Sequence, residues 1–192
     1  MLHTLQSQRT TALRERLEQA GYVFDFVVQA VDEYQAPGEA QHREALAALF
    51  EAIQARAQRW QRQLIEREPK YAQHVWPDLS ADLTQARAQA LDATAIAALV
   101  QEGGALCRAF RDPPYGTPLQ VSDFREWLQA LRLHPEDPVQ VFDWVGDPDI
   151  NPGRSGWSDY FDDGKEWWGI WCLTIYNPRR RTLAALAASA TD

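Results

Sequence analysis

The stretch WWGIWCLTIYNPRRRTLAALAAS, residues 167–189, decides the fold class of this chain. Its first part, which ends at Tyr176, is aromatic and β-branched with apolar residues on both faces, and this predicts a buried strand. Asn177 and Pro178 suit the first two positions of a type I turn, so we expect a hairpin whose second strand is the alanine-rich remainder. In the alternative, Asn177 caps a C-terminal helix that has Pro178 at its first position. Arginines at 179–181 disfavour that helix, because they would crowd the positive end of its dipole.

The residues just before this hairpin also depart from a helical pattern. VQVFDWV, residues 139–145, is a β-branched and aromatic run that is too short for a typical helix, so it predicts another strand. Residues 146–165 contain four glycines and two prolines. We expect a long irregular loop there.

The chain up to about residue 133 is predicted to be mainly helical. Apolar residues among Arg, Glu and Gln predict a short helix over 4–20. Residues 22–35 leave strand and helix open, and steps of three and four between apolar residues favour helix. The clearest helix covers 39–67, where one apolar stripe runs from Leu46 through Trp60 to Leu64 and is expected to face the core.

Further helices are expected on both sides of a proline-rich loop. Ser80 is predicted to cap a helix that runs through Leu91, with breaks at residues 92–94 and at Gly103-Gly104. DPPYGTP at 112–118 excludes helix. Ser122 is predicted to cap the next helix. Together these patterns predict an α+β fold in a single domain, residues 1–192. In it an N-terminal helical bundle (about 1–133) packs on a small C-terminal antiparallel sheet (about 134–192).

The charge of the chain is concentrated in its C-terminal third. The formal net charge is −8 and the sequence pI is about 5.0. Residues 136–166 carry nine acids against two bases, and five of the eight tryptophans lie between positions 144 and 171. Nucleic acid and anionic membranes require clustered Lys and Arg, so neither is expected as a partner. A basic protein partner is compatible with this charge.

Cysteine and histidine usage points to an intracellular protein without a cofactor. Cys107 and Cys172 lie 65 positions apart without a CxxC motif, and the four histidines are scattered, so we expect neither a disulfide framework nor a structural zinc site. The N-terminus has no apolar leader, and no apolar run is long enough to span a membrane. We therefore expect a soluble, cytoplasmic protein.

The acidic loop resembles two kinds of catalytic or metal site only in part. Asp147, Asp149 and Asn151 have the spacing that opens a calcium loop, but Pro152 stands at the required glycine and Ser158 at the required glutamate. No metal is therefore expected.

A carboxylate pair drawn from Asp159, Asp162 and Asp163 could serve a glycosidase, and nearby aromatic rings could supply a sugar platform. We expect no nucleophile, because G-x-S-x-G is absent and Cys172 lies in an apolar strand.

Trp157 lies among Gly, Ser and Asp in the acidic loop, and two interpretations stay open. As an exposed aromatic rimmed by acids it has the composition of an interface hot spot. Alternatively it folds back and anchors its own loop. Trp168 and Trp171, in the following strand, are expected in the core.

These observations favour an interaction protein that binds a basic protein partner. Inhibitors of basic toxins, such as bacterial immunity proteins, share this size and charge, although no family motif is present. The predicted contact consists of Asp147, Asp149, Trp157, Asp159, Asp162 and Asp163. The alternatives are a hydrolase, acting on a sugar-like substrate or dependent on a metal, that uses carboxylates of residues 143–166, and a structural subunit without chemistry.

Overall fold

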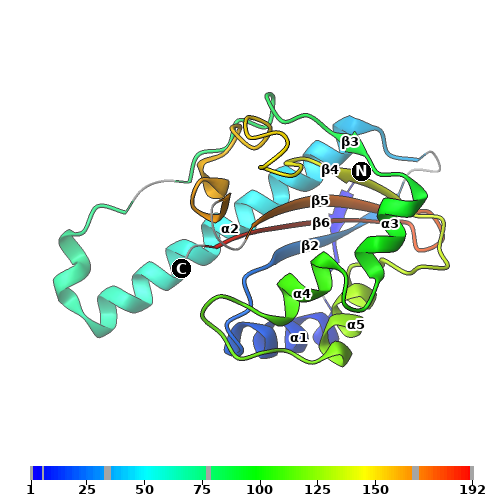
Figure 1. Ribbon diagram of the computed structural model, residues 1–192. Helices are drawn as coiled ribbons and strands as arrows, with labels where there is room; N and C mark the ends of the chain where they lie inside the picture. The colour runs from blue at the N-terminus through cyan, green and yellow to red at the C-terminus, as the bar shows by residue number, and fades with distance from the viewer. Residues whose placement is uncertain (1, 6, 33–35, 77–78, 166–168, 191–192) are drawn as a thin grey trace.

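The computed structural model describes residues 2–5, 7–32, 36–76, 79–165 and 169–190. Within these residues six strands form one antiparallel sheet in the order β1-β2-β6-β5-β4-β3 (Figure 1). The strands are β1 (Leu2–Thr4), β2 (Asp25–Val31), β3 (Gln89–Ala90), β4 (Gln140–Asp143), β5 (Ile170–Asn177) and β6 (Thr182–Ser189). The α-helices are α1 (Gln8–Gln19), α2 (Glu39–Arg67), α3 (Ala93–Val100), α4 (Ala105–Arg111) and α5 (Val121–Ala130). Short 3-10 helices are η1 (Pro69–Gln73), η2 (Asp159–Phe161) and η3 (Asp163–Lys165).

The predicted C-terminal hairpin is confirmed, and β5 and β6 form the centre of the sheet. They pair in register from Ile170 opposite Ser189 to Asn177 opposite Thr182. The Asn177 side chain closes the connection, because its Oδ1 accepts a hydrogen bond from the Arg180 backbone N–H at 3.0 Å. The asparagine therefore caps a turn and not a helix.

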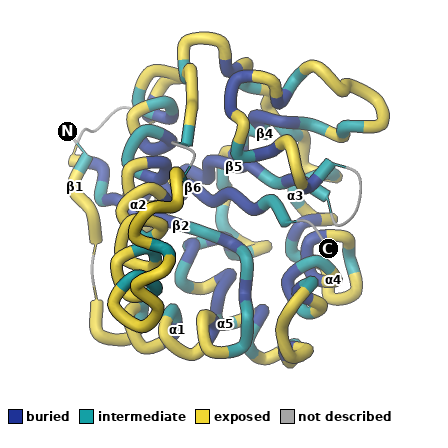
Figure 2. The backbone as a smooth tube through the Cα atoms, turned by 90° about the vertical axis from the view of Figure 1, so that its left-hand side faces the viewer, coloured by how far each residue is buried: buried dark blue, intermediate teal, exposed yellow. Residues whose placement is uncertain are grey.

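Helices cover both faces of the sheet and create two separate cores. In β6, Ala184 and Leu186 belong to the core beneath α1, α3, α4 and α5, while Leu183 and Ala185 belong to the core beneath α2. Figure 2 shows the central strands as buried backbone between exposed outer turns of helix. The α+β class is confirmed, since helices enclose an antiparallel sheet.

The expectation of a helix over residues 22–35 is wrong for the described residues, because the structure places β2 at Asp25–Val31; residues 33–35 lie outside the described part of the chain. This strand lies between β1 and β6 and is buried on both faces, with Phe26 and Val28 toward one core and Val27 and Val31 toward the other. Burial on both faces removes the alternation of apolar and polar residues that identifies a strand. The spacing of the apolar residues in this segment therefore resembles that of a helix.

Two predicted N-caps are also wrong. Ser80 does not begin a helix: residues 80–88 are irregular apart from a turn at 83–85, and the neighbouring Ala81 makes an isolated β-bridge with Ser158. Helix α5 begins one residue before Ser122, at Val121, with a capping box in which the Asp123 carboxylate accepts from the Gln120 backbone N–H at 3.0 Å. The predicted break at residues 92–94 falls at the start of α3. The predicted break at Gly103-Gly104 lies between the end of α3 and the start of α4.

Helix α2 is confirmed at Glu39–Arg67, but its apolar stripe contacts the core only as far as Ile53. Its C-terminal half and η1 project away from the sheet (Figure 1). Trp60 lies on this projecting half with 49% of its surface exposed, and its ring makes an edge contact with Trp76 at 5.3 Å between centroids. The expectation that Trp60 is a core residue is therefore wrong.

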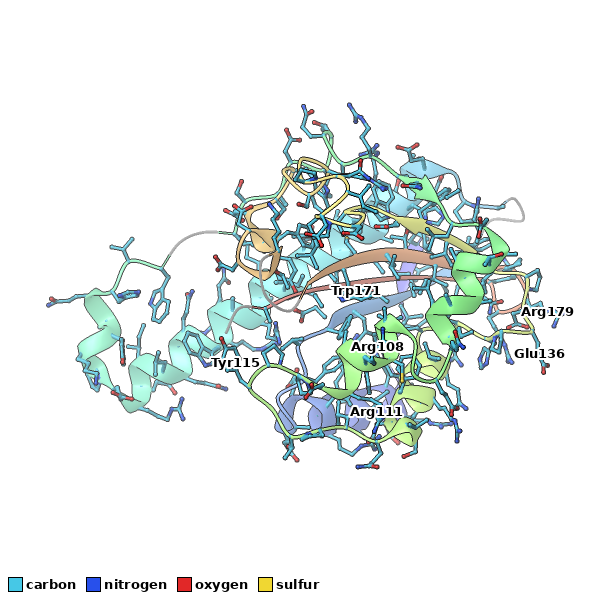
Figure 3. All side chains as sticks on the ribbon, viewed as in Figure 1. Arg108, Arg111, Tyr115, Glu136, Trp171 and Arg179 are labelled. Atoms are coloured by element: carbon cyan, nitrogen blue, oxygen red, sulfur yellow. The ribbon has the colours of Figure 1, made fainter. Side chains whose placement is uncertain are left out.

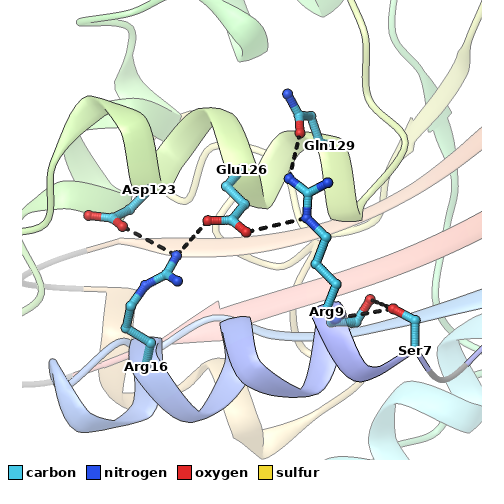
Figure 4. Close-up of polar contacts among 7 residues, drawn as sticks. Ser7, Arg9, Arg16, Asp123, Glu126 and Gln129 are labelled. Carbon is cyan, nitrogen blue, oxygen red and sulfur yellow. Dashed lines mark hydrogen bonds and ion pairs between the residues drawn. The ribbon is translucent and has the colours of Figure 1, made fainter.

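Salt bridges between α1 and α5 hold the helices on the other face side by side (Figure 4). The Arg16 guanidinium contacts the Glu126 carboxylate at 2.6 Å and the Asp123 carboxylate at 3.4 Å, and Arg9 approaches Glu126 at 3.5 Å. These partly exposed pairs contribute little to stability individually, but they align the two helices along their length.

Candidate functional site

A wide cleft of about 1050 Å³ lies between α2 and the 3-10 segment η2–η3. The turn between α1 and β2 supplies part of its floor through Tyr22 and Val23, and the loop after α4 supplies Tyr115 at its edge. It thus joins segments that lie far apart in the sequence, including Leu79 and the end of β6. Three of the six predicted contact residues, Asp159, Asp162 and Asp163, line this cleft.

The acidic wall of the cleft is built by local hydrogen bonds. Ser158 starts η2 by accepting the Tyr160 backbone N–H on its hydroxyl at 3.2 Å. Asp159 accepts the Ser80 backbone N–H at 2.9 Å, which ties the segment to residues before β3. Asp162 pairs with Lys165 at 2.8 Å, and all three aspartates of this wall are exposed. The wall therefore presents negative charge on a backbone that is fixed in place.

Asp147 and Asp149 lie in a different part of the same loop and do not line the cleft. The Asp147 carboxylate accepts the Asp149 backbone N–H at 2.9 Å, and both residues are exposed. This is the ordinary local turn of an aspartate in a surface loop. The structure separates these two residues from the acidic wall.

Trp157 folds back into the core and is not an exposed contact residue. It is 5% exposed, and its indole N–H donates to the Trp144 carbonyl at 3.1 Å. Its ring packs edge-on against Phe50 of α2 at 5.3 Å and against Phe161 at 5.2 Å. Of the two interpretations left open by the sequence, the structure supports the anchor, and Trp157 is removed from the predicted contact.

Trp168 and Trp171 were both expected in the core, and the structure describes only the second of them. Trp171 is half-buried and packs against the core beneath α1, α4 and α5. Trp168 lies outside the described residues.

The wall opposite the acids consists of arginine and aromatic side chains. Arg56, Arg59 and Trp60 come from successive turns of α2. Figure 3 shows Tyr115 on the loop that follows α4, and 67% of this residue is exposed. That loop is held against α1 by a close approach at Gly116, where an added Cβ would lie 2.1 Å from the Ala20 carbonyl oxygen. The cleft is therefore lined by two exposed aromatic residues, Trp60 and Tyr115, in addition to the acidic wall.

A partly buried ion pair between Asp25 and Arg56 lies next to the cleft, and the sequence reading missed it. The Asp25 carboxylate contacts the Arg56 guanidinium at 2.7 Å, and the Tyr160 hydroxyl is placed to hydrogen-bond it. Burial raises the pKa of Asp25 to about 6, and the charge of Arg56 opposes this shift. Asp25 was overlooked because it lay in a stretch expected to be helical. An acid inside an otherwise apolar strand was the available signal.

Other residues considered for chemistry do not join this cleft. Cys172 is buried in β5, where burial raises the pKa of its thiol well above the usual value, and Cys107 is buried and free. His74 is exposed and His134 half-buried in connecting segments. Among the described residues, no cluster of His, Cys, Asp or Glu is arranged to hold a metal ion. No helix in the described ranges is both long and apolar enough to cross a membrane.

Comparisons with known proteins assign no family. No protein-family model matches the chain, and none of the curated proteins matches it in sequence. Function is therefore argued from the cleft alone.

Proposed function

We propose that this chain is a protein-interaction module that binds a basic segment of a partner protein in the cleft between α2 and residues 159–163. An inhibitor or immunity-type role is compatible with this activity. The observation that carries the proposal is the acidic wall of Asp159, Asp162 and Asp163, whose carboxylates line the cleft and are exposed. Such a wall attracts Lys and Arg side chains over several ångströms and raises the rate of association.

The aromatic residues across the cleft support the same partner chemistry. Trp60 and Tyr115 are exposed aromatic residues that line the cleft, and aromatic rings attract arginine and lysine side chains through cation–π attraction. Tryptophan and tyrosine are also enriched among residues that dominate binding energy. Of the two arginines that line the cleft, Arg56 is paired with Asp25. The cleft therefore combines an acidic wall with aromatic contacts for a basic chain.

The test compares two charge-matched double variants. Asp162→Asn/Asp163→Asn removes two charges from the acidic wall, whereas the control Asp147→Asn/Asp149→Asn removes two exposed charges of the same loop away from the cleft. Wild type and both variants are immobilised, exposed to lysate of the source cells, and the retained proteins are identified by mass spectrometry. We expect a basic protein on wild type and control but not on the wall variant.

Kinetics with the purified partner then test the mechanism. The wall variant should associate about tenfold more slowly at low salt, and its difference from wild type should shrink as added salt screens the charges. Thermal midpoints should stay nearly equal, because exposed carboxylates contribute little to stability. A partner that binds all three proteins at the same rate would contradict the proposal.

One observation favours a second candidate, a hydrolase for a sugar-like substrate. Asp25 has its pKa raised to about 6 and lies beside Arg56 and Tyr160, which line the cleft, and such a pKa suits a general acid near neutral pH. Asp159, Asp162 or Asp163 would supply the second carboxylate. Cleavage of nitrophenyl glycosides between pH 5 and 7 by wild type, with loss of activity in Asp25→Asn, would establish this alternative.

A further inference from the structure

A smaller pocket of about 90 Å³ opens from the floor of the cleft, between α1, β2 and α2. It shares Glu18, Tyr22, Arg56 and Arg59 with the cleft, and Arg14 of α1 completes its cationic lining. One ordered water needs only about 10–15 Å³ of such volume. The pocket therefore has room for a small polar group such as a carboxylate or a phosphate.

The arginines of this pocket have unused hydrogen-bond donors. Arg14 donates to the Phe26 carbonyl at 2.6 Å and lies over the Phe26 ring at 4.4 Å, but it forms no ion pair within the described residues. Burial lowers the pKa of Arg14, so its charge is only partly compensated. Arg59 is exposed, and it too has no ion-pair partner in the described part of the chain. A guanidinium carries five N–H donors, so both side chains can bind an additional acceptor.

Tyr22 supplies a second, independent sign of a ligand. The residue is 7% exposed, and its hydroxyl is buried without a hydrogen-bond partner among the described residues, while the side chain lines the pocket. Edge contacts with Phe110 at 5.3 Å and Trp127 at 5.9 Å hold the ring in place. Buried hydroxyl groups in native proteins nearly always have a partner. An acceptor in the pocket would satisfy this hydroxyl.

We propose that this pocket binds an oxyanion, the carboxylate or phosphate group of a ligand, between the guanidinium groups of Arg14, Arg56 and Arg59 and the hydroxyl of Tyr22. Guanidinium groups match the paired oxygens of carboxylates and phosphates and bind them through short, charge-assisted hydrogen bonds. The three cations face two carboxylates, Glu18 and Asp25, so an anion is attracted by the remaining positive charge. The evidence for this site does not depend on a basic partner at the acidic wall, although the pocket shares Arg56 and Arg59 with the cleft.

Protonation of Asp25 should strengthen the binding. Arg56, Arg14 and Glu18 act on Asp25 from α2 and α1, and Tyr160 and Tyr22 flank it from η2 and the turn before β2. Among these groups Asp25 is the one whose pKa is placed near 6. When it becomes neutral, one negative charge beside the bound anion disappears. Affinity should therefore increase as the pH falls from 7 to 5.

The experiment titrates the full chain with small anions and follows backbone amide shifts by NMR. Sulfate keeps its charge between pH 5 and 7 and serves as the probe for the pH dependence, and inorganic phosphate and acetate separate the two ligand classes. N-acetylglycine and its amide test for a peptide C-terminal carboxylate. The test variants are Tyr22→Phe, which removes only the unpaired hydroxyl, and Arg59→Gln. Arg62→Gln is the control, since Arg62 is exposed on the same helix outside the pocket.

We expect saturable one-to-one binding, with shifts centred on the residues around Tyr22. Tyr22→Phe should keep the thermal midpoint of the free protein and bind about tenfold more weakly, and Arg59→Gln should also lose about tenfold, whereas Arg62→Gln should match wild type. Absence of saturation by every anion below about 10 mM would overturn the proposal. So would affinities that neither Tyr22→Phe nor Arg59→Gln reduces.

Discussion

His42 should make the stability of this protein depend on pH in a direction opposite to Asp25. The imidazole is fully buried on α2, and its Nδ1 lies 2.7 Å from the Thr174 hydroxyl, which also accepts the Trp144 indole N–H at 2.8 Å. The other ring nitrogen, Nε2, has no hydrogen-bond partner within the part of the chain that the structure describes. A protonated imidazole would have to bury a second N–H without an acceptor. Burial accordingly lowers the pKa of His42 from 6.5 to about 4.

The sign and size of the effect follow from proton linkage. Between pH 6.5 and 4 the unfolded chain binds a proton at His42 more readily than the folded chain, so the stability contributed by neutral His42 is lost as the pH falls through this window. The full shift corresponds to about 3 kcal/mol at most. For Asp25, the pKa rises from 3.8 to about 6, so stability is lost as the pH rises through that range, again by about 3 kcal/mol at most.

The two residues can be separated by urea denaturation of single variants between pH 4 and 7. In wild type the contributions of His42 and Asp25 should nearly cancel between pH 4 and 6, so its free energy of unfolding should follow only the slope of the exposed carboxylates. Asp25→Asn should lose stability steeply as the pH falls, since only His42 then titrates. His42→Asn, whose amide can still pair with Thr174, should instead gain stability as the pH falls. Exposed carboxylates affect all three proteins alike, so differences in slope isolate the two buried groups.

The slopes also define what would refute this reasoning. If His42→Asn has the same pH dependence as wild type, His42 does not titrate in this window, and the inference from its unpaired Nε2 fails. If Asp25→Asn is flat between pH 4 and 6, the opposing contribution of His42 is absent. Proton NMR of the His42 ring would measure its pKa directly and provide an independent check.

Two further predictions concern packing. Trp157→Ala should lower the free energy of unfolding by about 3–5 kcal/mol because it empties a buried site, whereas Trp60→Ala should cost less than about 1 kcal/mol at its exposed position; equal urea midpoints would contradict this assignment. Gly116→Ala should be strongly destabilising, because its Cβ would meet the Ala20 carbonyl oxygen, while Gly153→Ala opens into free space and should leave the thermal midpoint within about 2 °C of wild type.

Part of the candidate site could be read from local composition. The concentration of acids after residue 136 directed attention to Asp159, Asp162 and Asp163, and these three do line the cleft. Spacing could not separate them from Asp147 and Asp149, which share their composition and exposure. The first three aspartates line the cleft and the other two do not. This is because a hydrogen bond ties η2 to the residues before β3, and η2 packs against Phe50 of α2.

The sequence by itself determined the α+β class, the long helix α2 and the β5–β6 hairpin. Each of these depends on neighbours in sequence, such as a sustained 3.6-residue pattern or a turn capped by Asn177. Tertiary structure alone decided the identity of β2, because a strand buried on both faces loses its alternating pattern. Tertiary structure also decided which turns of α2 are buried. Ile53 lies in the core against the sheet, whereas Trp60 lies beyond the edge of the sheet and is exposed. The pairing of Asp25 with Arg56 was decided in the same way, because it joins elements whose contact no local pattern encodes.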